Sequence, residues 1–111
     1  MPDAVLIVEV PSMRVVFANR YAETFAAKQL GRPPRLSPAD VEGEVLRPDG
    51  TRCERDAWPL IRATRGERVT DERLVDLLPG GRRIALLVSA APVEDADGNV
   101  VAAVAIGRAL A

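Results

Sequence analysis

The last third of the chain restricts the fold more than any other part, because three β-rich runs follow one another there with only short turns between them. The runs span residues 68–78, 83–93 and 99–108. Pro79-Gly80-Gly81 separates the first two and Asp95-Ala96-Asp97-Gly98 the last two, and both sequences are typical of tight turns. Strands joined by hairpins pair antiparallel. The region therefore predicts a three-stranded antiparallel meander.

Two more β-rich runs lie at the start of the chain. Residues 4–10 are apolar except for one glutamate, as expected of a strand that is covered on both faces. Residues 14–18 follow after a short turn that contains Pro11 and Ser12. We therefore predict that these two runs form an antiparallel hairpin.

Two short helices are predicted between the hairpin and the meander. The first covers about residues 20–29, after Asn19, whose side-chain oxygen suits a helix N-cap. We expect Asp56 to cap the second helix, because Pro59 would then fall in its first turn, where a missing N–H costs little. Gly66 is expected to end that helix.

The order of these elements defines a fold class. A chain of 111 residues can build one hydrophobic core but is too short for two, so residues 1–111 are expected to form a single domain. Two strands, two helices and three strands predict an α+β domain with a five-stranded antiparallel sheet and short helices on one face. Residues 32–53 contain several prolines and are expected to be mainly irregular.

Short motifs in this framework resemble the opening and the turns of bacterial PAS domains. In chain order, the motifs are residues 15–23 (Val-Val-Phe-Ala-Asn-Arg-Tyr-Ala-Glu), Asp49-Gly50-Thr51, residues 58–63 (Trp-Pro-Leu-Ile-Arg-Ala) with Gly66-Glu67, Gly80-Gly81-Arg82, and Ala91-Pro92-Val93 with residues 95–100. The resemblance covers nearly the whole chain. It implies the PAS strand order 2-1-5-4-3 and a sensory domain that belongs to a larger signalling protein.

The same resemblance implies a function. PAS domains serve as sensory and dimerisation modules of signal-transduction or transcription-regulatory proteins, and they bind a small molecule or a partner and pass the signal to an output domain. Relatives hold ligands on the concave side, between helices and sheet, and the residues expected to line this pocket are Phe17, Tyr21, Phe25, Trp58 and Ile61. The alternative for these side chains is an ordinary packed core. Two other hypotheses are a ligand-free scaffold for protein–protein contacts and a small enzyme of related fold.

The residue types present argue against catalysis and against bound metals or cofactors. The chain has no histidine, which excludes catalytic histidine pairs and haem ligated by histidine. Photosensing relatives place a cysteine in an Asn-Cys-Arg motif against a flavin, whereas Cys53 lies in Thr51-Arg52-Cys53-Glu54, so a flavin–cysteine adduct is not expected. The carboxylate pairs Asp71-Glu72 and Glu94-Asp95 are expected to be solvated. We therefore predict no enzyme activity, no metal site and no identifiable cofactor.

Charge and cysteine content limit the partners and the compartment. The chain has 15 basic and 16 acidic residues, so no net field draws it to nucleic acid or to an anionic membrane. A single cysteine cannot form an intrachain disulfide, and no apolar run is long enough to span a membrane. A cytoplasmic location is therefore expected.

The meander is apolar on both sides, which predicts an interface. Helices can cover one face of the sheet, and a large apolar patch on the other face usually marks a contact surface. We expect a homodimer through that outer face, with Leu87, Ser89, Val101 and Ala103 in the contact. The alternative is that a helix upstream in the full protein covers the face.

Overall fold

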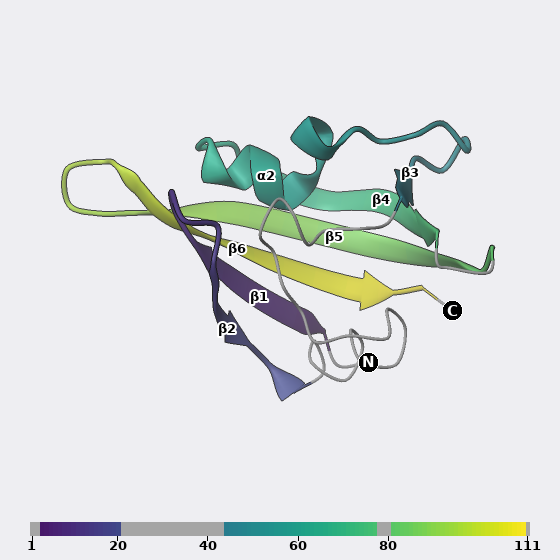
Figure 1. Cartoon of the computed structure of the whole chain (residues 1–111), viewed down its shortest axis with the longest axis horizontal. Helices are drawn as coiled ribbons and strands as arrows, with labels where there is room; N and C mark the ends of the chain where they lie inside the picture. Colours follow the sequence, from purple (N-terminus) through teal and green to yellow (C-terminus); the bar gives the residue numbers. More distant parts are fainter. Residues whose placement is uncertain (1–2, 21–43, 78–80, 111) are drawn as a thin grey trace.

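The structure is a computed structural model that describes residues 3–20, 44–77 and 81–110 (Figure 1). Its strands, in chain order, are β1 (Ala4–Glu9), β2 (Val15–Ala18), β3 (Glu44–Leu46), β4 (Val69–Leu77), β5 (Arg83–Glu94) and β6 (Val100–Ala109). The helical elements that it describes in full are the 3₁₀ helix η2 (Arg55–Ala57) and the α-helix α2 (Pro59–Thr64). All five predicted strands are confirmed. The predicted helix over residues 20–29 lies outside the described residues, apart from Arg20.

The strands form one antiparallel sheet in the order β2-β1-β6-β5-β4-β3. Without β3, this order is the expected 2-1-5-4-3. The sixth strand is a three-residue addition at the edge beside β4, too short to produce a periodic sequence pattern. A hydrogen bond of 2.7 Å from the Cys53 N–H to the Val45 carbonyl ties it to the segment before η2. The predicted α+β fold is thus confirmed, with one extra edge strand.

Helix α2 begins at Pro59 and not after a side-chain cap at Asp56. Proline fixes its own φ and forces the preceding residue to be extended, so Trp58 (φ −64°, ψ 139°) takes the N-cap position without a side-chain cap bond. Asp56 lies inside η2, and its carboxylate accepts a 3.1 Å hydrogen bond from Arg65. The expected cap at Asp56 was therefore wrong. Gly66, at φ +96°, follows the helix as predicted, in a conformation that favours glycine.

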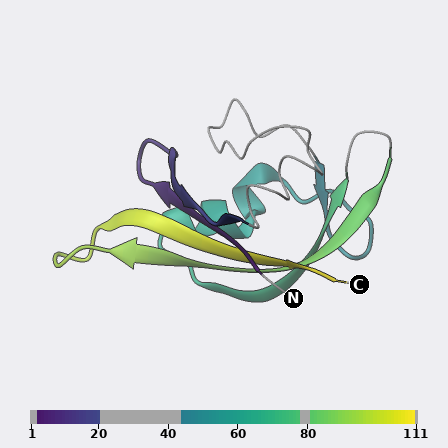
Figure 2. The same cartoon turned by 90° about the horizontal axis from the view of Figure 1, so that it is seen from below.

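Helix α2 packs on one face of the sheet, which curves around it (Figure 2). We call this side the concave face and the opposite side the outer face. The core between helix and sheet consists of Val8, Ala63, Ala90 and Ala103, of which Val8, Ala63 and Ala103 are fully buried. Three of the four are alanines, and their small side chains let α2 lie close to the strands. Among the described helices, none is long and apolar enough to cross a membrane.

The strand registers assign each residue of the meander to a face. Residues directly opposite each other on paired antiparallel strands point to the same side of a sheet. Ser89 is opposite Ile106, and Leu87 is opposite Arg108. Since Ala90 lies in the core beneath α2 and successive residues of a strand alternate between faces, Ser89 and Leu87 of β5 lie on the outer face, as predicted.

Ala103, by contrast, belongs to the concave face. Ala103 is opposite Val8 on one side and Pro92 on the other, and it is fully buried with Ala63 of α2. The expectation that Ala103 lies on the outer face was wrong, whereas Val101 is the extra residue of a register shift between β5 and β6, where the alternation of faces is interrupted. The β6 residues on the outer face are Ala102, Val104 and Ile106. Because β6 is apolar on both sides, its sequence pattern did not reveal which set faced the helix.

Candidate functional site

The centre of the concave face, where a PAS-like ligand pocket was expected, is a packed core. Ala63 of α2 lies fully buried against Ala90 and Ala103 of the sheet, and Leu60 packs against the same cluster. Of the predicted pocket residues that the structure describes, none belongs to this core. A ligand site on the concave face must lie to one side of this core.

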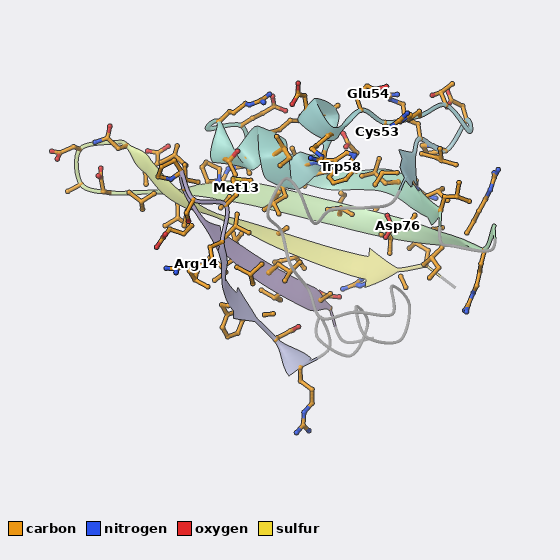
Figure 3. The ribbon with its side chains drawn as sticks, in the orientation of Figure 1. Met13, Arg14, Cys53, Glu54, Trp58 and Asp76 are labelled. Carbon is orange, nitrogen blue, oxygen red and sulfur yellow. The ribbon has the colours of Figure 1, made fainter. Side chains whose placement is uncertain are left out.

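Trp58 is the predicted pocket residue whose contacts are best defined, and they are structural. Its indole N–H donates a 3.1 Å hydrogen bond to the Cys53 carbonyl. The guanidinium of Arg55 lies 5.7 Å from the ring centroid, within the range of a cation–π contact. Trp58 thus fastens the segment before η2 to the start of α2 (Figure 3).

The other four predicted pocket residues do not assemble around Trp58 in the described part of the chain. Phe17 lies on the edge strand β2 and is 49% exposed. Its cross-strand partner is Ile7, whose own partner Val104 is on the outer face, so Phe17 points away from α2 and its placement in the pocket was wrong. Ile61 is partly buried on α2, but Leu60 is the residue that packs on the core. Tyr21 and Phe25 lie outside the described residues.

Cys53 is held in a form that disfavours reactivity. The side chain is only 4% exposed, and desolvation, the largest effect on it, raises the pKa of the thiol above its ordinary value. A reactive cysteine needs its thiolate, which a raised pKa makes scarcer at neutral pH. The sulfur lies 3.8 Å from the Glu54 carbonyl oxygen, a contact in which the thiol is the donor.

An arginine on α2 connects the helix to the sheet. Arg62 forms ion pairs with Glu67, just after the helix, and with Glu72 of β4, to which its guanidinium donates at 2.9 Å. Glu72 had been expected to be solvated, and it is partly buried instead. Arg62 and Glu72 thus hold one end of α2 against the sheet.

Asp71, the partner of Glu72 in that predicted pair, lies in a β-bulge. The register between β4 and β5 shifts between Val69 and Glu72, and Asp71 has a left-handed φ of +50°. Its N–H donates to the Ser89 hydroxyl at 2.9 Å. The bulge brings Glu72 onto the concave face, toward Arg62, while Asp71 remains exposed as predicted.

Asp76 is the unusual ionisable group of the concave face, and the sequence analysis missed it. It lies on β4 opposite Ile84 of β5 and Val45 of β3, and Ile84 alternates with Leu86, Val88 and Ala90 on the face that α2 covers. Figure 3 shows it on the part of the sheet near β3. Desolvation raises the pKa of the Asp76 carboxyl to about 6. Among the described residues, none forms a hydrogen bond or ion pair with it.

One sequence signal marks Asp76 in retrospect. It interrupts the apolar run Leu74-Val75-Asp76-Leu77-Leu78, in which a charged residue has no reason to occur unless that position is solvated or used. The sequence pattern of the strand did not show which face of the sheet Asp76 occupies. In the part of the chain that the structure describes, no three His, Cys, Asp or Glu side chains lie together as a metal site.

Comparison with known proteins supports the resemblance drawn from the sequence. A family model described as the PAS fold matches residues 1–111. No curated protein sequence matches the chain.

Solved structures are similar in fold at low sequence identity. The light-state structure of the blue-light photoreceptor Aureochrome1 LOV matches with a TM-score of 0.64 and 20% identity, covering 97% of this chain and 81% of that one. A blue-light activated histidine kinase from Erythrobacter litoralis, EL346, matches with a TM-score of 0.65 and 18% identity, covering 99% of this chain but 33% of the kinase. The light-state dimer of the fungal photoreceptor Vivid matches with a TM-score of 0.55 and 17% identity, covering 96% and 76%.

Proposed function

Because this chain belongs to the PAS fold family, we propose that it is a cytoplasmic sensory and dimerisation module of a larger signal-transduction or transcription-regulatory protein. In this proposal it binds a small molecule or a partner on its concave face and passes the signal to an output domain outside this chain. The observation that carries the proposal is the match of the family model to all 111 residues. The similarity to one part of a light-activated histidine kinase agrees with a domain that works inside a longer protein.

The first test asks whether the domain retains a small molecule. We expect native mass spectrometry of the purified domain to show a mass above that of the polypeptide, which denaturation releases. The reason is that a site with an unpaired, partly buried carboxyl gains free energy from a ligand that satisfies it. A bare polypeptide mass from several expression hosts and buffers would instead favour the ligand-free scaffold, the second hypothesis.

The proposed dimer uses the outer face, with its members corrected to Leu87, Ser89, Val104 and Ile106. Ile106 and Val93 are 41% and 42% exposed there, and they adjoin Ala102 and Val104 on the same face. Exposed aliphatic side chains that adjoin one another on a sheet favour association. The similarity to a photoreceptor structure solved as a dimer supports this use of the fold.

Two positions on opposite faces of β6 test which face of the sheet forms the dimer. Ile106 on the outer face is 41% exposed, and Val100, which is opposite Glu94 on the concave face, is partly exposed. An Ile106→Glu substitution should raise the dimer dissociation constant at least about tenfold, because a twofold interface then contains two new carboxylates. Val100→Glu is the control on the concave face and should leave the constant unchanged.

Sedimentation velocity over a range of concentrations measures both constants. A wild-type protein that stays monomeric at micromolar concentration would remove the dimer from the proposal. Equal weakening by the two substitutions would contradict the assignment of the interface to the outer face.

We propose no catalytic role, and the small enzyme stays the weakest hypothesis. The chain has no histidine, and its one cysteine is buried with a raised pKa. Nor do we propose a haem ligated by histidine or a flavin–cysteine adduct, since the first lacks its ligand and Cys53 lies in a different motif.

A further inference from the structure

We propose that Asp76 anchors the ligand of the concave face, and that this ligand is a small, mainly apolar molecule carrying a positively charged nitrogen, such as an amine or amidine. The inference rests on the proposed function, since it names the class of ligand that the sensory face would take. It follows from the position of the carboxyl, its surroundings and its lack of a partner.

The surroundings of Asp76 are aliphatic. Its cross-strand neighbours on the concave face are Val45 and Ile84, and Leu74, two residues earlier on the same side of β4, is only 6% exposed. Leu86 is opposite Leu74 on that face. Asp76 itself remains partly exposed, so a molecule from solvent has access to it. An apolar body would lie against these side chains, with its polar group at the carboxylate.

The carboxylate has no partner of its own in the described part of the protein. Arg47 donates to the Arg52 carbonyl, and Arg62 binds Glu67 and Glu72. Arg73 and Arg83, on the two strands beside the carboxylate, lie on the outer face. Desolvation alone accounts for the raised pKa of Asp76, and no charged group contributes to it. Cys53, in the segment bonded to β3, has a raised thiol pKa, so it stays neutral and adds no charge.

A cationic nitrogen fits this site better than other ligand classes. A partly buried carboxylate without a donor is costly, and a charged N–H group supplies both the hydrogen bond and the opposite charge. An anion would be repelled. A hard metal ion would require several more oxygen ligands, and Glu72, the other concave-face carboxylate of β4, is bound to Arg62.

Two fragments of matched size test the inference. Benzylamine carries the ammonium group, and benzyl alcohol presents the same ring with a neutral hydroxyl. Titration of each into the ¹⁵N-labelled domain, followed by amide chemical shifts, should show benzylamine binding at least about tenfold more tightly near neutral pH, a ratio expected of one charge-assisted hydrogen bond. The largest shifts should fall on the amides of residues 45, 76 and 84.

An Asp76→Asn variant should abolish this preference, because it keeps the shape of the side chain and removes the charge. Asp97→Asn, in the exposed turn between β5 and β6, is the matched control and should leave the preference unchanged. The preference of the wild type should also decline between about pH 7.5 and pH 5, as the carboxyl becomes protonated.

The possible negative results distinguish the proposed cationic ligand from the proposed sensory function. Equal binding of both fragments at these amides would overturn the cationic anchor and leave a ligand site on the concave face. A preference for benzylamine that survives in Asp76→Asn would overturn the role of Asp76. If neither fragment binds on this face, the result would count against the cationic anchor. A ligand retained in native mass spectrometry would then show that the sensory proposal survives without a cationic anchor at Asp76.

Discussion

An Ala103→Arg variant should fail to fold, whereas an Ala102→Arg variant should fold normally. The two residues are neighbours on β6 and lie on opposite faces of the sheet. Ala103 is fully buried and packs with Ala63 of α2, so an arginine there would place an unpaired charge in the core and displace the helix. Such a burial costs more than about 4 kcal/mol of unfolding free energy, most of the stability of a small domain.

Ala102 is the control because it is partly exposed and lies on the outer face, opposite Glu9 of β1. An arginine there can reach solvent and that carboxylate, so at a protein concentration low enough to keep the domain monomeric we expect the unfolding free energy to change by less than about 0.5 kcal/mol. Urea titration followed by circular dichroism measures both variants. A folded, cooperative Ala103→Arg protein would contradict the assignment of the faces, on which the proposed dimer and the proposed ligand site both depend.

Replacing Asp76 with asparagine should stabilise the domain at neutral pH and have little effect near pH 4. The pKa of Asp76 rises from an ordinary 3.8 to about 6 on folding, so the folded state binds a proton more tightly than the unfolded state. The favourable contribution of the protonated carboxyl is complete below pH 3.8, and it is lost as the pH rises through about 6. Wild-type stability should therefore decline across this window.

The size of this effect follows from the shift. A change of about two pKa units corresponds to about 3 kcal/mol, and the partial exposure of Asp76 reduces the expected gain in Asp76→Asn to about 1–2 kcal/mol above pH 7. Chemical denaturation of both proteins at several pH values measures it, with Asp97→Asn as the control. Parallel stability curves for wild type and Asp76→Asn would show that the carboxyl is not desolvated.

Ala103 and Asp76 differ in what they contribute to the proposed function. In the core beneath α2, the small side chains, their burial and the strand pairing all favour the same packing. Asp76 breaks this consistency, since it places a charge on an apolar face without a partner in the described residues. Residues that lower the stability of the free protein often belong to sites that a ligand completes. This is why we place the ligand beside Asp76 and not at the centre of the face.

The sequence by itself determined where five of the six strands lie, and the family resemblance supplied their order. β-rich runs separated by turn sequences predicted five strands, and Gly66 marked the end of α2, although the helix begins at Pro59 and not after Asp56. These features depend on local preferences: hairpin turns need particular φ values, and proline and glycine restrict where a helix begins and ends. The family resemblance rested on the same local motifs and was confirmed by the family match.

Only the tertiary structure decided which face each residue occupies and which groups lack partners. The strands of the meander are apolar on both sides, so their sequence contained no alternation that could have assigned Ala103 to the core. The short strand β2, Val15-Val16-Phe17-Ala18, is likewise apolar throughout and did not assign Phe17 to the outer face. The bulge at Asp71 shifts the register of β4, and no local preference of the sequence specified it. The isolation of Asp76 depends on what surrounds it in space, because burial and pairing are set by residues from strands that are distant in the chain.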